Sequence, residues 1–444
     1  MLGRPAAPIL AALLVRLACL PFAADLPTIG DAHGYVFLAR ELRAGRMAYL
    51  KEGVRPPLHR VLAAPVLSED GSPFPGVFLV QIAADVLACA LLVRLTRRRF
   101  GEAPGVAAGW CYALYPPSIL VSATVVMTES LLSLAAALSM LALDALDRRL
   151  RHGPAPGLAV ALGIALGAGM LSNELMTMTT GVVLVTLVLR HGAPLRRRVL
   201  AAAVTGAVAA ACVLPWALHN QRVHGLPVVS GTYGPFNMLV ENAPPGRDGL
   251  TLWREPASMR DKVDRARAIF RRALLEYPRL TFERALVRVR VAAGPEITLP
   301  AWFGITYDGL AFPDTSNLAL FRQGWRMSQG TWARHLQLVC GVAALFFFAL
   351  GAAGLAGSPP CALRSAGRLL ALAWFVTLAL TVADARYRIA LVPFLCPFAG
   401  LAAAALSVDR VRARLGPVAT LKGAMLGLVV AAVLVTTIFR LPMP

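Results

Sequence analysis

Charged residues are scarce in this chain. Asp, Glu, Lys and Arg make up 15% of the 444 residues, whereas soluble globular proteins average about 25%. Hydrophobic residues account for 57% of the sequence, and the mean hydropathy is +0.63. This composition excludes intrinsic disorder, a fibrous protein and a small disulfide scaffold, and it indicates a polytopic membrane protein.

Acidic residues are scarcer than basic ones, at 24 against 44, which leaves a net charge of +20. In a soluble protein this excess would suggest a nucleic-acid partner. Here most of it lies in short clusters beside apolar runs, as the positive-inside rule expects of cytoplasmic flanks. We therefore interpret the charge as a topology signal and expect no nucleic acid. The clusters are Arg94 to Arg99, Arg148 to Arg151, Arg190 to Arg198, Arg364 with Arg368, and Arg410 to Lys422.

Eleven apolar runs approach the roughly 20 residues that a bilayer-spanning helix needs. We interpret the stretch between the arginines at 151 and 190 as two helices, because two crossings keep both clusters on one side. Eleven spans then place the N-terminus and all the basic clusters in the cytoplasm. The runs are 8–23, 76–96, 103–123, 128–147, 157–171, 175–189, 199–217, 335–357, 369–383, 389–407 and 424–439.

The predicted fold is an all-α polytopic membrane protein with about 11 transmembrane helices, amphipathic helices on the outer face and one large extracytoplasmic loop. The predicted parts are an N-terminal bundle 1–217 that includes a first outer loop 24–75, the extracytoplasmic region 218–333, and the C-terminal helices 334–444. Helical spacing of apolar residues predicts an amphipathic helix from Asp261 to Tyr277. We expect it to lie on the membrane surface or pack on the bundle rather than act in catalysis.

The N-terminal 23 residues have an alternative interpretation as a cleavable signal peptide. Arg16 interrupts the apolar stretch, and cleavage would remove the first crossing, so we favour a retained span. The seven cysteines fall in spans or on the inner side and show no zinc spacing, and we expect no disulfide in the exported loops. The sequence contains no P-loop, dinucleotide fingerprint, HExxH or GxSxG motif. Hydrolase and ATPase functions therefore have no support, and no nucleotide cofactor is expected.

Acidic residues in or beside membrane spans are costly, so they tend to face a cavity, form pairs or take part in function. Four such places share the predicted outer face: Asp31 after the first span, Glu129 at the start of the fourth, Glu174 in a turn, and the connection Asp384-Ala385-Arg386-Tyr387-Arg388.

Each of these residues also has a structural interpretation. Asp31 and Glu129 could cap or begin helices, and Glu174 could be a solvated turn residue. Arg386 and Arg388 could pair with Asp384 or with lipid headgroups. Their position on one predicted face favours a site. Nearby, Arg55-Pro56-Pro57-Leu58-His59-Arg60 predicts a rigid extended turn, in which His59 could carry a proton or remain a hydrogen-bonding surface group.

The order of motifs resembles that of the GT-C type polytopic glycosyltransferases, in particular the bacterial members of glycosyltransferase family 39 related to protein O-mannosyltransferases and the lipid A aminoarabinose transferase. The resemblance covers nearly the whole chain. In chain order the motifs are Asp31, Tyr35, Ala39 and Gly45; Pro56-Pro57-Leu58; Tyr115-Pro116-Pro117 with Thr128-Glu129-Ser130; Pro215-Trp216-Ala217-Leu218-His219-Asn220 with Gly225; Gly234 to Asn237 with Glu241-Asn242-Ala243-Pro244; Glu276-Tyr277-Pro278; and Arg386-Tyr387-Arg388 with Pro393.

This resemblance implies an enzyme of the plasma (inner) membrane that moves a sugar from a polyprenyl-phosphate donor to a lipid, glycan or protein acceptor, with inversion. Asp31 would be the general base, and Glu129 would orient the acceptor or help to hold a divalent metal in members that use one. We expect two further sets of residues. The donor phosphate would contact Arg386, Tyr387, Arg388 and Arg55, and the substrates would contact Tyr35, His59, Asn220 and Asn237.

Three positions depart from the family pattern. Ala32 stands where many relatives have an acidic residue, Asn173-Glu174 where they often have Arg-Pro, and His219 where an arginine is common. These departures keep open a catalytically silent assembly subunit as an alternative. A transporter or flippase for a lipid-linked sugar is a second alternative, which the lack of internal repeats and the outer position of the polar residues disfavour.

Overall fold

The computed structural model describes residues 5–24, 31–50, 53–293, 331–381 and 385–415, with 423, 425–428 and 430. Within these ranges the chain is helical, and the only β-type pairing is an isolated bridge between Leu50 and Gly53. Seven helices of the described residues are long and apolar enough to cross a membrane. The expected class, an all-α polytopic membrane protein, is confirmed.

The long apolar helices lie in the segments Ala6–Ala23, Gly76–Phe100, Glu129–Leu150, Leu195–His224, Val339–Gly357, Ala362–Leu380 and Tyr387–Ser407. Their helices are α1 (Ala6–Cys19) with the 3₁₀ helix η1 (Leu20–Ala23), α4 (Gly76–Phe100), α7 (Glu129–Leu150), α10 (Leu195–His224), α17 (Thr331–Gly357), α18 (Ala362–Leu380), and the 3₁₀ helix η3 (Ala385–Leu391) with α19 (Val392–Ser407).

The shorter helices connect or flank these spans. They are α2 (Asp31–Arg43), α3 (Leu58–Ala63) with η2 (Ala64–Val66), α5 (Glu102–Ala113), α6 (Pro116–Thr124), α8 (Pro156–Ser172), α9 (Leu175–Leu189), α11 (Tyr233–Asn242), α12 (Gly249–Arg254), α13 (Met259–Glu276), α14 (Pro278–Ala293) and α20 (Asp409–Leu415).

The stretch expected to form one span at 103–123 is two helices in the structure. α5 ends at Ala113, and α6 begins at Pro116. Pro116 restricts Tyr115 to an extended conformation, with φ −77° and ψ 105°, and a proline cannot donate the hydrogen bond that would continue α5. The apolar run counted as one span therefore consists of two helices that meet at the Tyr115-Pro116 junction.

The stretch 157–189 does form two helices, α8 and α9, which meet at Asn173 and Glu174. Both are apolar but shorter than the long spans. The last expected span, 424–439, lies mostly outside the described residues. The total of about 11 crossings therefore stays a prediction, whereas the amphipathic helix expected at 261–277 is confirmed as α13.

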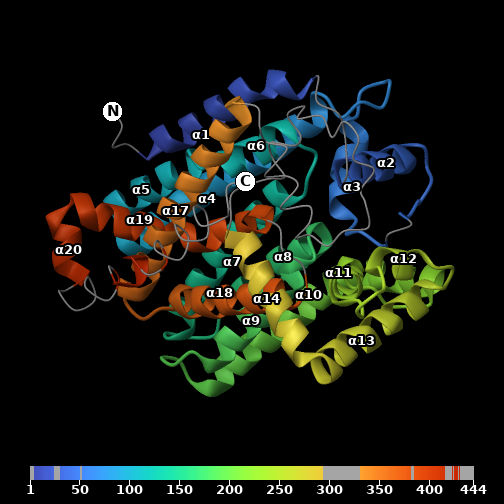
Figure 1. The fold of residues 1–444 in the computed structure, drawn as a ribbon. Helices are drawn as coiled ribbons and strands as arrows, with labels where there is room; N and C mark the ends of the chain where they lie inside the picture. Colours follow the sequence, from blue (N-terminus) through green and yellow to red (C-terminus); the bar gives the residue numbers. More distant parts are fainter. Residues whose placement is uncertain are drawn as a thin grey trace.

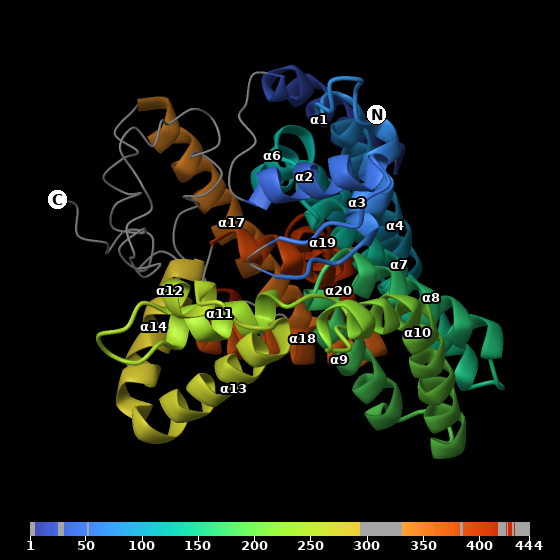
Figure 2. The same ribbon diagram turned by 90° about the vertical axis from the view of Figure 1, so that its right-hand side faces the viewer.

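Described helices of the two segments expected outside the membrane gather at one end of the bundle. Figure 1 shows α2 and α3 beside α11, α12 and α13 on the right, while the N-terminus and α20 lie on the left. Figure 2 looks onto the end that holds α2, α3 and α11 to α13. We call this end the predicted outer face, because its orientation rests on the charge pattern.

Close helix packing holds the bundle together. α8 packs along α10, and α19 packs between α5 and α17. A Cβ on Gly163 would lie 2.7 Å from the Thr205 carbonyl oxygen, and one on Gly354 would lie 1.8 Å from the Phe398 carbonyl oxygen. Glycine at these positions lets the helix backbones approach, which is how membrane helices often associate.

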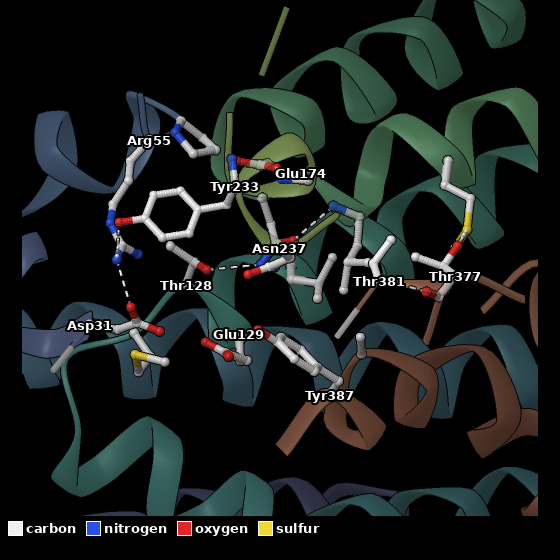
Figure 3. Close-up of a pocket in the computed structure, with 18 of the residues that line it drawn as sticks. Asp31, Arg55, Thr128, Glu129, Glu174, Tyr233, Asn237, Thr377, Thr381 and Tyr387 are labelled. Carbon is white, nitrogen blue, oxygen red and sulfur yellow. Dashed lines mark hydrogen bonds and ion pairs between the residues drawn. The ribbon is translucent and has the colours of Figure 1, made fainter. Parts of the chain in front are cut away.

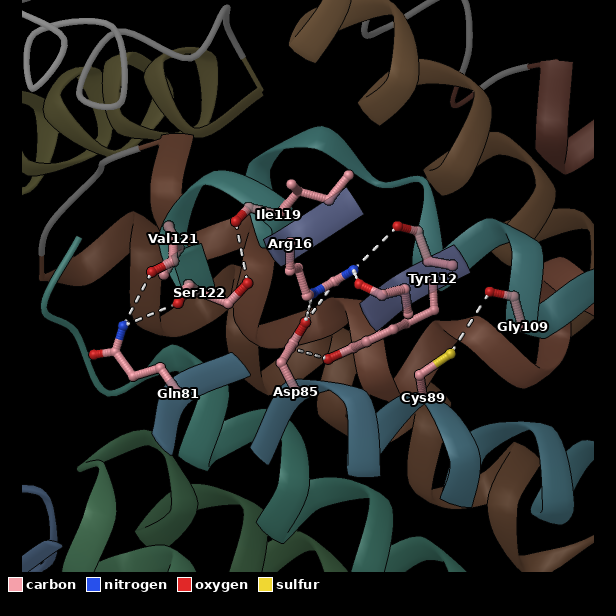
Figure 4. A network of polar contacts seen from close by, with 11 residues as sticks. Arg16, Gln81, Asp85, Cys89, Gly109, Tyr112, Ile119, Val121 and Ser122 are labelled. Carbon is pink, nitrogen blue, oxygen red and sulfur yellow. Dashed lines mark hydrogen bonds and ion pairs between the residues drawn. The ribbon is translucent and has the colours of Figure 1, made fainter. Parts of the chain in front are cut away.

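A buried ion pair joins α1 to α4 inside the apolar bundle (Figure 4). Nε and Nη2 of Arg16 each lie 2.5 Å from Oδ2 of Asp85, and the Tyr112 hydroxyl donates to Oδ1 of Asp85 over 2.5 Å. Arg16 is 0% and Asp85 2% exposed. Pairing is needed here because an isolated charge in this environment is very unfavourable. Arg16, considered above only as an interruption of an apolar run, therefore has a defined partner.

The irregular segment between α6 and α7 is stabilised by Gln81 of α4. Its Nε2 donates to the carbonyl oxygen of Val125 over 2.7 Å, and its Oε1 accepts the backbone N–H of Met127 over 2.8 Å. Non-helical backbone at membrane depth needs such partners, because lipid offers none. Gln81 thereby holds the start of α7, where Thr128 and Glu129 lie.

Candidate functional site

A cavity of about 250 Å³ opens at the predicted outer face between α2, α7, α9, α11, α18 and η3. Figure 3 shows polar side chains from α2, α7, α11, α18 and η3 around it, together with Glu174 from the turn before α9. Of the residues expected from the sequence to act in catalysis or binding, the cavity lining includes Asp31, Tyr35, Arg55, Glu129, Asn237 and Tyr387.

Asp31 and Arg55 form an ion pair at the wall of this cavity. Asp31 is the first residue of α2, and Arg55 lies in the loop that leads to the proline pair before α3. Nη2 of Arg55 donates to Oδ1 of Asp31 over 2.6 Å. The Arg55 side chain is 7% exposed and that of Asp31 33%. The carboxylate therefore reaches the cavity while the guanidinium is enclosed.

Two tyrosine rings enclose the guanidinium of Arg55. Its Cζ lies 4.4 Å from the ring centroid of Tyr35 and 4.2 Å from that of Tyr233, within range of cation–π attraction. The Tyr233 hydroxyl accepts a hydrogen bond from Nη2 over 2.9 Å. Burial opposes the charged form, but Tyr35, Asp31 and Tyr233 together raise the pKa of Arg55 well above its usual value. Arg55 is a fixed positive charge at the cavity.

Glu174 is bound to the backbone at the start of α11. Oε1 accepts the N–H of Tyr233 over 3.0 Å, and Oε2 accepts that of Gly234 over 2.9 Å. A carboxylate is well placed there, because the first N–H groups of a helix lack partners within it. Burial raises the pKa of Glu174, while the two backbone hydrogen bonds lower it. The interpretation as a solvated turn residue was wrong: its carboxylate holds Tyr233 in place.

The segment around Tyr233 is also tied to the first outer loop. The N–H of Val54 donates to the Thr232 hydroxyl over 2.8 Å, and the N–H of Thr232 donates to the Val54 carbonyl oxygen over 2.9 Å. A Cβ on Gly231 would lie 1.9 Å from Oε1 of Glu174, so only glycine allows this approach. Arg55 and Tyr233, 178 residues apart, are placed by these contacts.

The start of α7 brings Thr128 and Glu129 to the cavity. Thr128 is the residue before the helix, and its hydroxyl accepts a hydrogen bond from Nδ2 of Asn173 over 2.9 Å. Oδ1 of Asn173 accepts the N–H of Leu175 at the start of α9 over 3.0 Å. Asn173, a departure from the family pattern, therefore joins α7 to α9 beside Glu129.

The rest of the cavity is mostly apolar. Leu132, Leu175, Met178, Met238 and Leu378 line it together with Thr377 and Thr381. Such a cavity, polar on one side and apolar on the other, suits a ligand with both a charged and a hydrocarbon part.

Two of the expected substrate-binding residues lie outside the cavity lining. His59 is 2% exposed, and its ring centroid lies 4.9 Å from that of Tyr35. Burial lowers its pKa to about 4, with Gln81 opposing the shift and Arg55 adding to it. Asn220 is 0% exposed and donates to the carbonyl oxygens of Trp216 and Val228 over 2.9 and 3.3 Å. His59 thus packs on the cavity-lining Tyr35, whereas Asn220 joins α10 to the segment that precedes α11.

The connection between α18 and α19 contributes Tyr387 to the cavity, and the Tyr387 carbonyl oxygen accepts a hydrogen bond from Nε1 of Trp374 over 3.1 Å. Arg388 is buried, 3% exposed, and lies outside the lining. Asp384 and the side chain of Arg386 lie outside the described residues.

Buried polar contacts with α14 and α18 hold the C-terminal end of α11. Nη1 of Arg288 in α14 donates to the Ala379 carbonyl oxygen of α18 over 2.9 Å, and its Nε lies 3.7 Å from Oε2 of Glu241. Asn242 donates to the Leu380 carbonyl oxygen over 3.0 Å. Burial raises the pKa of Glu241 to about 7, against the opposing effect of Arg288 and Arg284. α11 is thus held at both ends.

Sequence reasoning missed Tyr233 and the supporting roles of Thr128 and Asn173. An aromatic residue between two glycines, at Gly231-Thr232-Tyr233-Gly234, was the available signal for Tyr233. No local pattern marks Thr128 and Asn173 as partners, because 45 residues separate them.

The carboxylates at the cavity do not form a ready metal centre. Over the described part of the chain, no group of three or more His, Cys, Asp or Glu side chains could hold a metal ion. Asp31 already pairs with Arg55, and Glu174 with backbone N–H groups. These residues do not fit a bound divalent cation as they stand.

Comparison with known proteins finds one matching family model and several solved structures of similar fold. Residues 54–219 match the family model described as dolichyl-phosphate-mannose-protein mannosyltransferase. No curated protein sequence matches the chain.

Two solved structures are similar in fold. ArnT from Cupriavidus metallidurans, bound to undecaprenyl phosphate, is 15% identical, with a TM-score of 0.50 over 92% of this chain and 61% of ArnT. The oligosaccharyltransferase of Archaeoglobus fulgidus in its apo form is 17% identical, with a TM-score of 0.54 over 98% of this chain and 55% of that protein.

The same archaeal enzyme, AglB, has also been solved with an inhibitory peptide and a dolichol-phosphate, and that structure matches with a TM-score of 0.51 at 14% identity, over 98% of this chain and 54% of AglB. This chain thus spans less than two thirds of the length of either protein. The resemblance drawn from the motifs is confirmed: the chain is a polytopic membrane protein with the fold of the GT-C glycosyltransferases.

Proposed function

We propose that this protein is a membrane glycosyltransferase that moves a sugar from a polyprenyl-phosphate donor to an acceptor outside the cytoplasm. The observation that carries the proposal is the cavity itself, in which the paired Asp31 and Arg55 face an apolar wall. A polyprenyl-phosphate sugar has the matching parts: an anionic phosphate, a polar sugar and a hydrocarbon chain.

Asp31 acts as the general base in this proposal. Its carboxylate takes the proton from an acceptor hydroxyl or amine as the acceptor heteroatom attacks the anomeric carbon. The bond between that carbon and the phosphate oxygen breaks, and polyprenyl phosphate leaves with the electron pair. A single displacement inverts the anomeric configuration. Asp31 suits this role because its side chain is one-third exposed to the cavity.

Arg55 holds the donor phosphate and stabilises the charge that develops on the leaving group. Arg386, Tyr387 and Arg388 contribute from the connection before α19, and Glu129 orients the acceptor. Tyr35 and Asn237 contact the sugar, while His59 and Asn220 act through the packing described above. The site faces outward from the plasma membrane, with the N-terminus in the cytoplasm.

The similar proteins support the donor class. ArnT was solved with undecaprenyl phosphate and AglB with a dolichol-phosphate, and the matching family model names a dolichyl-phosphate-mannose substrate. An outward-facing site also has no access to cytoplasmic nucleotide sugars, so its donor must be delivered through the bilayer. The lipid-phosphate donor meets this requirement.

Mass spectrometry of envelope glycolipids and glycoproteins, with and without the gene, tests the function and names the sugar and acceptor together. We expect one glycoconjugate to disappear in the deletion strain and to return with the wild-type gene. Asp31→Asn should express and fold normally but fail to restore it, with a loss of transfer of about 10²- to 10⁴-fold. Normal restoration by this variant would exclude Asp31 as the base.

The alternatives have their own readouts. A flippase would move an intact labelled lipid-linked sugar between leaflets of proteoliposomes without sugar loss, whereas a transferase consumes the donor only when acceptor is present. An assembly subunit would tolerate Asp31→Asn, while deletion of the gene would still remove the glycan.

A further inference from the structure

The corner between α13 and α14 carries a set of exposed apolar side chains. Leu275 is 74% exposed, Phe282 63% and Leu286 44%. They differ from the inward-facing side chains of α13. Ala266, 0% exposed, clusters with Leu239 of α11 and Trp253 of α12, and Ala273 is 4% exposed. The corner therefore exposes apolar surface that the fold itself does not use.

This corner lies at the side of the bundle. Figure 2 shows the junction of α13 and α14 at the periphery of the predicted outer face. α14 crosses the end of α18, where Arg288 donates to the Ala379 carbonyl oxygen. Along α18, Leu372 and Phe375 are 61% and 49% exposed, as expected of side chains that face lipid. The helix that begins at the corner, α14, thus packs farther along its length against a lipid-facing helix.

The charges around the corner complement an anionic membrane surface. Residues 255–284 contain eight basic and five acidic residues, which leaves a net charge of +3. Four of the arginines are in ion pairs, and the surplus comes from the other basic residues, among them Arg271 and Arg284. The pairs are Arg265 with Glu255, Arg267 with Asp264, Arg272 with Glu276 and Arg279 with Glu283. Apolar side chains flanked by surplus arginine are typical of segments that lie in the headgroup region of a bilayer.

We propose that the corner formed by the end of α13 and the start of α14 inserts into the headgroup region of the bilayer that the chain spans, with Leu275 and Phe282 in the acyl boundary and the arginines on anionic lipid phosphates. α11, which lines the cavity, packs on α13. The lipid contact of the corner therefore fixes the distance between this wall of the cavity and the membrane. The proposal goes beyond sugar transfer and does not require it.

Site-specific photocrosslinking tests the lipid contact directly. p-Benzoylphenylalanine replaces Leu275 or Phe282 in the full chain, reconstituted in nanodiscs with equal amounts of phosphatidylcholine and phosphatidylglycerol. Leu372, exposed on α18, serves as the lipid-facing control position, and Arg254, exposed on α12, as the water-facing one. After illumination, peptide mass spectrometry identifies what each position has bonded to.

We expect lipid adducts at positions 275 and 282 in yields comparable with position 372 and well above position 254. Adduct yields at positions 275 and 282 as low as those at 254, while position 372 is labelled, would overturn the proposal. The same holds if membranes from cells give adducts at 275 and 282 only with another protein.

The anionic preference has a separate test. Phosphatidylglycerol adducts at position 275 should exceed phosphatidylcholine adducts by about fivefold, the order that one arginine near an anionic surface contributes. The triple variant Arg271→Gln, Arg272→Gln, Arg279→Gln should bring the two lipids close to parity, while the control Arg254→Gln should change nothing. Equal labelling by both lipids in the wild type would refute the role of the arginines.

Discussion

Nη2 of Arg55 lies 2.6 Å from Oδ1 of Asp31, so the proposed phosphate ligand and the proposed general base form one ion pair. The Tyr233 hydroxyl accepts a hydrogen bond from the same Nη2. A donor phosphate that binds Arg55 would compete with Asp31 for the guanidinium. Donor binding and release of the carboxylate toward the acceptor are therefore coupled in the proposed reaction.

Arg55→Gln tests this coupling. Removing a charge-assisted hydrogen bond to an anion costs about 1.5–3 kcal/mol, so kcat/KM for the donor should fall by about 10- to 100-fold. Arg55→Lys should recover only part of the lost kcat/KM, because lysine keeps the charge but lacks the planar group that lies between the two rings. Arg46→Gln, at an exposed arginine paired with Glu41, is the matched control. Wild-type donor kinetics in Arg55→Gln would refute the role of Arg55.

Glu174→Gln should weaken the start of α11. A glutamine side chain offers one oxygen where two backbone N–H groups donate, and a buried donor left without a partner costs about 1–3 kcal/mol. We expect a lower Tm in detergent and slower transfer. Gly231→Ala should act in the same way, since its Cβ would meet the Glu174 carboxylate.

Tyr233→Phe separates positioning from stability at the same place. It removes only the hydroxyl that accepts from Arg55, so Tm should stay near the wild-type value while transfer falls. Glu69→Gln, at an exposed glutamate, should change neither Tm nor transfer.

A Glu174→Gln protein with normal Tm and normal transfer would show that the carboxylate does not hold α11.

His59 should make the protein less stable in acid. Burial, with Arg55 adding to it and Gln81 opposing it, lowers its pKa from 6.5 to about 4, so the unfolded chain binds the proton more readily. The resulting stability is present above pH 6.5 and is lost as pH falls toward 4, by about 3 kcal/mol in total. His59→Gln should remove this slope from the unfolding free energy. An unchanged slope would contradict a buried neutral histidine.

Glu241 should have the opposite effect. Burial raises its pKa from 4.5 to about 7, despite Arg288 and Arg284, so the folded chain binds the proton more readily. Its contribution is present below pH 4.5 and is lost as pH rises toward 7. Glu241→Gln should remove this fall in the unfolding free energy with rising pH. The increase with pH that His59 causes should then be visible by itself. If both variants show the wild-type pH profile of unfolding, neither group titrates as described.

The buried pair of Arg16 and Asp85 should behave as a unit. Arg16→Met or Asp85→Leu alone leaves a charge buried without its partner, at a cost of about 3–5 kcal/mol. The double variant should recover most of the folded yield and Tm, because two apolar side chains of similar size suit the same space. A double variant no more stable than the worse single one would show that the pair has another role.

Sequence patterns were enough to predict the elements whose formation depends on local hydrophobicity and charge. Apolar runs and arginine clusters predicted the helical class, the split of 157–189 into α8 and α9, and the amphipathic α13. These predictions hold because hydrophobic length and periodicity decide whether a segment can be a buried or amphipathic helix. The run 103–123, counted as one span, is divided into α5 and α6 because Pro116 interrupts the helix within the apolar run.

The candidate site was only partly predictable. Asp31, Glu129, Arg55 and Tyr387 were found from their residue types and shared side of the membrane, and they line one cavity. Glu174 was misread, because a polar turn looks solvated until α11 packs over it.

The sequence alone determined that this chain is a helical membrane protein with polar residues collected at one end, since hydrophobicity and charge act residue by residue along the chain. Only the tertiary structure decided which of those residues meet. Tyr233 reaches Arg55 across 178 residues and Arg16 reaches Asp85 across 69, because a buried polar group must find its partner wherever helix packing brings one.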